Sequence, residues 1–277
     1  MSLEAWTWLA WVALGGALAY GLLALALFLF QRRLIYATGR KPAEPQPLDG
    51  RLPEVLSAEA ADGSRCSHWL WTPRDPEKPL LVLLQGNAGN IGHRIDCYGF
   101  LVEDGYGLLL VGYRGYGGNP GKPEEAGIIA DARAALAALR QRLPRARVVL
   151  FGESLGAAVA IALAAEGETA PLFLLGPFDR LVSSAKARYP WMVVEPLLKE
   201  TWDSLARIDK VRQPLFWLHG AEDRVTPSRF GRRLFEAAPG PKTELVVPDG
   251  GHLGHLDDPE VRARFYDWLA RQTAPAV

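Results

Sequence analysis

One serine stands out in the sequence as a candidate nucleophile. Ser154 lies at the centre of the stretch GESLG, residues 152–156, between the apolar run RVVLF (147–151) and the alanine-rich segment LGAAVAIALAA (155–165). A strand that turns abruptly into a helix crowds its backbone, and glycine on each side of the serine relieves that crowding because it has no Cβ. The pattern predicts a nucleophile elbow, with an ordinary glycine turn as the alternative.

A serine hydroxyl needs a general base, and the base needs a carboxylate to orient it. The apolar run PLFWLHG (214–220) leads into AEDRVTP, which places Asp223 just after a predicted strand. The run TELVV (243–247) leads into PDGGHLGH, which places His252 after the last predicted strand. Because the carboxyl ends of parallel strands share one edge of a sheet, we expect Ser154, Asp223 and His252 to meet as a catalytic triad.

Each partner has a rival nearby. Glu222 could replace Asp223 as the acid, and His255 could replace His252 as the base. We favour His252 because it directly follows two glycines, which allow its loop to approach the serine. The alternatives without a catalytic role are a helix cap or a surface carboxylate for Asp223, and an ordinary loop histidine for His252.

Acyl transfer also needs an oxyanion hole, which is a pair of backbone N–H donors that converge on the carbonyl oxygen. The first should come from Leu155, next after the nucleophile. The second should come from the loop QGNAGN (85–90), where the backbone amide of Asn87 is our first choice and that of Ala88 our second. A merely tight turn between a strand and a helix is the alternative for this loop.

Short apolar runs that alternate with helix-length segments would carry these residues. Continuous apolar runs are typical of parallel strands covered on both faces, and the alternation predicts a doubly wound, mostly parallel α/β sheet. We expect strands at 80–84, 108–113, 147–151, 171–176, 214–220 and 243–247. We expect helices at 93–105, 123–143, 155–166, 228–238 and 261–272. The segments 54–60 and 65–71 flank an Asp-Gly turn and should form an antiparallel hairpin at the sheet edge.

The amino-terminal segment predicts one transmembrane helix. Residues 6–30 contain no Asp, Glu, Lys or Arg, and as a helix they would be about 37 Å long, enough to cross a hydrocarbon layer of about 30 Å. A cleaved signal peptide and a buried core helix are the alternatives, but the start lacks basic residues and QRR follows in place of a small-residue cleavage site. Basic residues follow the span and none precedes it, so the amino terminus should lie outside and the remaining chain in the cytoplasm.

The expected domains are a transmembrane anchor (1–35), a proline-rich linker (36–53) that lifts the rest off the bilayer, and the α/β domain (54–272). With 31 basic and 31 acidic residues, no net charge attracts nucleic acid, and small-molecule partners are favoured. The two cysteines, Cys66 and Cys97, are expected to be reduced and buried. No His-Glu-x-x-His pattern or cysteine cluster indicates a metal site.

As a set, the segments GNAGNIGHR, VGYRGYGGNPGKPEE, FGESLGAAVA, GPF, HGAEDRVTP and GGH resemble the α/β-hydrolase superfamily, and more narrowly its small membrane-anchored serine hydrolases. The resemblance covers residues 55–270. It implies a triad of Ser154, Asp223 and His252, and no cofactor. Relatives usually have histidine where this chain has Gln85, and often glycine where it has Ala157.

This resemblance implies a membrane-anchored hydrolase of carboxylic esters or thioesters, with a small-molecule or acylated, lipid-like substrate. The insertion at 177–213 is short and carries Phe178, Tyr189, Trp191 and Trp202, which could line an acyl pocket or simply fill the core. A serine aminopeptidase and a catalytically silent membrane scaffold remain alternative functions.

Overall fold

The computed structural model describes residues 2–39 and 41–273. Its central sheet has eight strands in the order β10-β9-β8-β7-β4-β6-β3-β2. The six strands from β10 to β6 are parallel, whereas β3 runs antiparallel to β6 and β2 antiparallel to β3. The strands are β2 (Glu54–Glu59), β3 (Arg65–Trp71), β4 (Leu80–Leu84), β6 (Gly107–Val111), β7 (Val148–Glu153), β8 (Leu172–Leu175), β9 (Leu215–Gly220) and β10 (Lys242–Val247). The predicted doubly wound sheet with its edge hairpin is confirmed.

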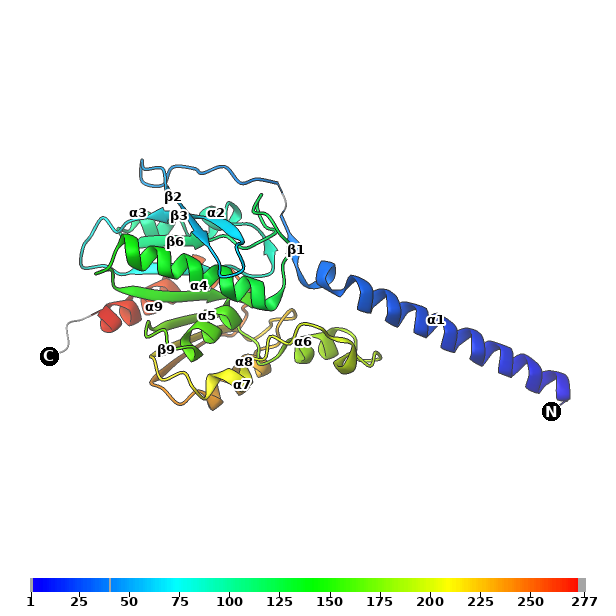
Figure 1. Cartoon of the computed structure of the whole chain (residues 1–277). Helices are drawn as coiled ribbons and strands as arrows, with labels where there is room; N and C mark the ends of the chain where they lie inside the picture. Colours follow the sequence, from blue (N-terminus) through cyan, green and yellow to red (C-terminus); the bar gives the residue numbers. More distant parts are fainter. Residues whose placement is uncertain (1, 40, 274–277) are drawn as a thin grey trace.

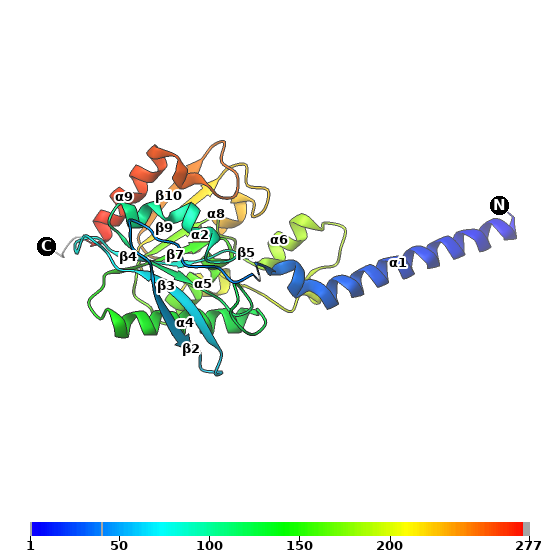
Figure 2. The same ribbon diagram turned by 90° about the horizontal axis from the view of Figure 1, so that it is seen from above.

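The central strands are apolar at every position because each sheet face is covered by helices. In β4, Leu80, Val82 and Leu84 pack into the core on one face, while Leu81 and Leu83 pack into the core on the other. The first face is covered by α4 (Glu125–Arg142), α5 (Leu155–Ala165), α7 (Leu205–Ile208) and α8 (Ser228–Ala237). The second is covered by α2 (His93–Tyr98), α3 (Phe100–Glu103) and α9 (Pro259–Thr273), so the helices form two layers around the sheet (Figure 2).

The chain reverses its direction of winding at β4. It passes from β4 to β6 on one side, and then crosses over to β7 on the other side. In an open α/β sheet, ligands bind beyond the carboxyl ends of the strands at such a switch point. The loop after β4 and the turn after β7 are therefore the two segments that this topology brings to the expected binding edge.

Most predicted helices lie within two residues of their expected bounds, but the helix expected at 93–105 is divided. Gly99 separates α2 from α3, and a Cβ at this glycine would lie 2.7 Å from the Leu48 side chain. Glycine is a weak helix former, and here its small size admits a side chain from the amino-terminal segment.

The helix α1 (Leu3–Ile35) projects from the domain (Figure 1), and its carboxyl-terminal half, from Tyr20 onward, contacts the domain. The segment that follows is extended and lies against the domain. Within it, β1 (Ala37–Thr38) pairs with the two-residue strand β5 (Ala88–Gly89), and Tyr36 and Leu48 are buried.

The insertion between β8 and β9 contains α6 (Leu181–Arg188), the 3₁₀ helix η1 (Glu195–Leu197) and α7, and a second 3₁₀ helix, η2 (His255–Asp257), precedes α9. We refer to residues 181–200 as the cap. Both cysteines are free, and Cys66 is buried, but Cys97 is exposed, so the expectation of burial was wrong for it. Cys97 lies on the outer side of α2, which is only six residues long.

Candidate active site

Ser154 lies at the junction of β7 and α5 in a strained backbone conformation. Its φ is 52° and its ψ is −112°, a combination that a residue with a side chain rarely adopts. A Cβ at Gly156 would lie 1.8 Å from the carbonyl oxygen of Leu84 in β4, and a Cβ at Gly152 would lie 2.5 Å from the Cα of Ala157. The two glycines therefore allow the close approach of strand and helix that the sharp turn requires.

The structure brings Ser154, His252 and Asp223 together, although they lie far apart in the sequence. The Nε2 atom of His252 is 3.0 Å from the Oγ atom of Ser154, and its Nδ1 atom is 2.7 Å from Oδ2 of Asp223. Both distances are within hydrogen-bond range. One imidazole thus bridges a hydroxyl and a buried carboxylate, which is the geometry of a base with an orienting acid.

The carboxylate of Asp223 is the most heavily hydrogen-bonded group of the site. Its Oδ1 accepts the backbone N–H groups of Val225 and Thr226, each at 2.8 Å, and its Oδ2 accepts the Thr226 hydroxyl at 2.9 Å. Burial acts to raise the pKa of Asp223, but hydrogen bonds from His219 and His252 outweigh it and hold the pKa well below its usual range. The side chain is therefore a carboxylate at neutral pH.

His219, a residue not anticipated from the sequence, is a second histidine at this carboxylate. Its Nδ1 lies 3.1 Å from the indole Nε1 of Trp217, and its Nε2 lies 3.0 Å from Oδ2 of Asp223. An indole N–H can only donate, so Nδ1 must accept and Nε2 carries the proton that is shared between Asp223 and the carbonyl oxygen of Thr226. The HG pair that ends the PLFWLHG run was the available signal, since it places a polar ring at the end of a buried strand.

The expected oxyanion donors lie beside the serine. Leu155 is the first residue of α5, so its amide has no acceptor within the helix. Asn87 is held by two contacts, because its carbonyl accepts the Tyr116 hydroxyl at 3.0 Å and its side-chain amide donates to the carbonyl of Ile35 at 2.8 Å. Asn87, Ser154 and Leu155 line the same cavity.

Glu153, next to Ser154, connects the elbow to the loop after β4. This fully buried carboxylate accepts hydrogen bonds from Arg94 (2.7 Å), the Tyr98 hydroxyl (2.7 Å) and the backbone N–H of Gly86 (3.2 Å). Gly86 directly precedes Asn87, so Glu153 fixes the position of the second expected oxyanion donor. The sequence offered no signal for this role, because Glu153 occupies a position of the Gly-x-Ser-x-Gly pattern at which any residue is allowed.

The rival residues are placed differently. Glu222 is exposed, and its backbone N–H bonds to the carbonyl of Gly250. His255 is buried, and burial lowers its pKa. Within residues 2–39 and 41–273, Ser154 and Asp223 are bonded to His252 and not to His255.

A cavity of about 1150 Å³ opens at Ser154 and reaches the last turns of α1. Apolar side chains of α1 and the cap line much of it, and residues 221–229 after β9, which include Glu222, Arg224 and Arg229, also line it. Two of the four aromatic residues suggested for an acyl pocket, Phe178 and Tyr189, line it. Trp202 is instead a core residue, and Trp191 is exposed at the tip of the cap.

Comparison with known proteins agrees with this geometry at the level of the family. The family model described as Serine aminopeptidase, S33 matches residues 75–193. The uncharacterised protein Rv2307c of Mycobacterium tuberculosis is 37% identical, with 94% of this chain and 92% of that protein covered. The α/β-hydrolase domain-containing protein WAV2 of Arabidopsis thaliana is 28% identical over 86% of each chain.

Solved structures share the fold. The esterase Pf2001 of Pyrococcus furiosus superposes with a TM-score of 0.69 at 19% identity, and the match covers 86% of this chain and all of that one. From Glu4 to Ile35 this chain also has a helix long and apolar enough to span a membrane, by length and composition a candidate span or signal sequence. The sheet, the elbow at Ser154 and these relatives together show that the chain belongs to the α/β-hydrolase superfamily.

Proposed function

We propose that the protein is a membrane-anchored serine hydrolase that cleaves carboxylic esters or thioesters of acyl or lipid-like substrates. The contact of His252 with both Ser154 and Asp223 is the observation that supports this proposal most strongly. The apolar cavity beside the serine supports an acyl substrate.

The proposed reaction begins when Oγ of Ser154 attacks the carbonyl carbon of the substrate while Nε2 of His252 takes the hydroxyl proton. Asp223 accepts the hydrogen bond from Nδ1 and stabilises the imidazolium that forms. The amides of Leu155 and Asn87 donate to the oxyanion of the tetrahedral intermediate. His252 then protonates the leaving alcohol or thiol, and the acyl group remains on Ser154.

Deacylation repeats these steps with water as the nucleophile. His252 takes a proton from the water molecule, which attacks the acyl carbon, and the proton returns to Oγ of Ser154 as the acid departs. The net reaction is ester plus water to acid plus alcohol, and none of its steps calls for a cofactor.

The family model's description favours a second candidate, a serine aminopeptidase. Such an enzyme needs a group that binds the substrate's free amine. Two described carboxylates line the cavity: Asp223 is occupied by its own hydrogen bonds, and Glu222 is exposed to solvent. We favour the ester hydrolase because the cavity wall formed by α1 and the cap is mainly apolar, and cleavage of aminoacyl amides without cleavage of any ester would reverse that preference.

We further propose that residues 1–35 remain as a membrane anchor, that 36–53 connect it to the hydrolase domain at 54–272, and that this domain is cytoplasmic. Retention of the helix is supported by Gln31, which is buried and donates from its side-chain amide to the carbonyl of Leu197 at 3.0 Å. A signal sequence removed by cleavage would take this contact with it. Intact mass of the membrane fraction tests retention, and protease access to a carboxyl-terminal reporter tests orientation.

Labelling with a fluorophosphonate probe tests the enzyme activity directly. The wild-type protein in detergent should be labelled and should hydrolyse p-nitrophenyl esters, and Ser154→Ala should lower the rate by at least about 10³-fold and abolish labelling. Equal labelling of both proteins would refute the assignment of Ser154. A folded wild-type protein that is neither labelled nor active would favour the scaffold.

A further inference from the structure

The membrane helix does more in this structure than hold the domain near a bilayer. Leu27, Phe28, Gln31, Leu34 and Ile35 of α1 line the same cavity as Ser154. From Leu27 onward, a side of the predicted transmembrane helix is therefore part of the wall of the candidate active site.

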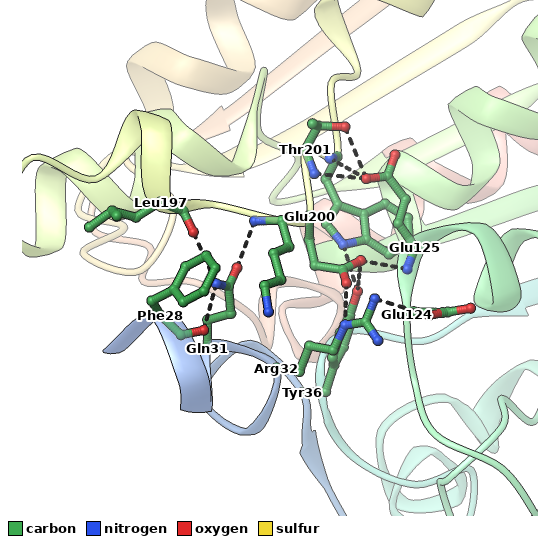
Figure 3. Close-up of polar contacts among 11 residues, drawn as sticks. Phe28, Gln31, Arg32, Tyr36, Glu124, Glu125, Leu197, Glu200 and Thr201 are labelled. Atoms are coloured by element: carbon green, nitrogen blue, oxygen red, sulfur yellow. Dashed lines mark hydrogen bonds and ion pairs between the residues drawn. The ribbon is translucent and has the colours of Figure 1, made fainter. Parts of the chain in front are cut away.

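Polar contacts hold this end of α1 against the cap (Figure 3). Gln31 donates to the carbonyl of Leu197 at 3.0 Å and accepts the backbone N–H of Lys199 at 2.7 Å. The ammonium group of Lys199 lies 4.2 Å from the centre of the Phe28 ring. These contacts join one face of α1 to the cap at the cavity.

A buried carboxylate completes the attachment. Glu200 accepts hydrogen bonds from Nε of Arg32 (2.6 Å), the hydroxyl of Tyr36 (2.9 Å) and the backbone N–H of Glu125 (2.7 Å). The indole of Trp202 donates to the same tyrosine hydroxyl at 3.1 Å. The end of α1, the cap and the start of α4 are thus fixed to one another around a single side chain (Figure 3).

The tip of the cap, residues 190–194, contacts α1 closer to its amino terminus than Gln31 and Arg32 do. The backbone N–H of Val193 donates to the hydroxyl of Tyr20 at 3.1 Å. At about 1.5 Å per residue, Tyr20 lies about 18 Å along the helix axis from Arg32. If Arg32 and Arg33 lie at the membrane surface, the tip lies beside the part of α1 that crosses the hydrocarbon layer.

The composition of the tip agrees with that position. Residues 190–194 read PWMVV, and Trp191 and Val193 are 56% and 62% exposed. Met192 and Val194 from the same stretch line the cavity. One stretch of the cap therefore presents apolar side chains both to the surroundings of α1 and to the interior of the site.

We propose that α1 and the cap form an acyl-chain channel, in which the last turns of the membrane helix are a wall of the substrate site and the chain enters from the bilayer. The occupant is the long acyl chain of a membrane-embedded ester or thioester. This inference rests on the proposed hydrolase activity at Ser154. The cavity has a volume of about 1150 Å³, which lies above the common range for small-molecule sites and is large enough for a long acyl chain.

A matched pair of substitutions on α1 tests the channel in the full-length protein in detergent micelles. Leu27 faces the cavity, and Leu29, two residues along the same helix, is 60% exposed. Leu27→Trp should lower the ratio of p-nitrophenyl palmitate to p-nitrophenyl butyrate hydrolysis by about tenfold or more, because a bulky ring narrows the channel. Leu29→Trp should leave this ratio unchanged.

Cysteine protection gives a second readout that does not depend on turnover. In a Cys97→Ser background, Leu27→Cys should react with a small thiol reagent, and phosphonylation of Ser154 by a hexadecyl fluorophosphonate should slow that reaction by about tenfold. A fluorophosphonate with an ethyl chain should leave the rate of this thiol reaction unchanged. The rate for Leu29→Cys should be the same with either probe as without.

The outcomes separate the two proposals. Equal palmitate-to-butyrate ratios for the two tryptophan variants, with no long-chain protection at position 27, would overturn the channel while the hydrolase stands. If the wild-type protein hydrolyses no ester and takes up no fluorophosphonate, the proposed function itself fails.

Discussion

The two sides of the cavity are built by different means. On the sheet side, Ser154, Asp223 and His252 follow the ends of parallel strands, and their positions are set by the backbone of a fully packed core. On the helix side, the last turns of α1 and the cap are joined by a few polar contacts around Gln31 and Glu200. For the proposed hydrolase, we infer that the sheet side determines which bond is broken and the helix side determines which acyl chain is accepted.

If this division is correct, substitutions on the sheet side should lower the rate for every ester, whatever its chain length. Substitutions on the helix side should instead change the preference among chains. The following predictions test this distinction, beginning with the largest expected effect.

Asp223→Asn should lower kcat by about 10⁴-fold for short and long esters alike. An amide at this position can donate to Nδ1 of His252, which would place the remaining proton on Nε2, where it blocks acceptance of the proton from Ser154. Steady-state kinetics with two chain lengths measure the effect. Asp209→Asn is the matched control, because this carboxylate is exposed and lies away from the residues that line the cavity, and its rate should stay within about threefold of the wild-type rate. Similar losses for both variants would contradict the role of Asp223.

Glu153→Gln should lower kcat by about 10- to 100-fold with little change in KM. The substitution weakens the contact with Gly86 and leaves the buried guanidinium of Arg94 without its ion-pair partner, so the oxyanion loop should shift. The thermal midpoint should fall as well. Glu166→Gln is the control, because Glu166 forms an exposed ion pair with Arg133. A change in KM alone would argue that Glu153 acts on substrate binding instead.

The sequence allowed the sheet side to be anticipated almost completely. Apolar runs, glycine pairs and the order of serine, acid and base are local signals, and the fold requires their convergence at one edge. His219 and Glu153 were missed because their roles depend on which side chains surround them after folding: a ring that bridges Trp217 and Asp223, and a carboxylate that bridges two strand ends.

The helix side was anticipated only in part: the insertion at 177–213 was expected to offer aromatic side chains to an acyl pocket, and Phe178 and Tyr189 line the cavity. Composition indicated a membrane span in residues 6–30, but periodicity does not reveal which face of so uniformly apolar a helix contacts the domain. The same holds for the segment at 36–53, whose prolines predicted an extended linker without indicating that Tyr36 and Leu48 are buried in the domain. Contacts between segments more than 150 residues apart, such as Gln31 with Leu197, leave no local signal.

Glu200→Gln should have the smallest effect and the most selective one. An amide keeps the shape of the side chain but loses the charge that Arg32 and the Tyr36 hydroxyl share, so the free energy of unfolding should fall by about 2 kcal/mol. The effect is limited because the Arg32 side chain is itself half exposed and can recover water. Since the attachment of α1 is loosened while the sheet side is untouched, the palmitate-to-butyrate ratio should fall several-fold, and kcat for butyrate should change by less than about twofold.

Glu195→Gln is the matched control for this last prediction. It removes one charge from the same cap, but from an exposed ion pair with Lys186 that does not involve α1. Its chain-length preference should equal that of the wild-type protein, because an exposed pair contributes about 1 kcal/mol or less and does not fix the channel wall. A uniform loss of activity on all chain lengths in Glu200→Gln would mean that the two sides of the cavity are mechanically coupled, and the proposed division of labour between them would fail.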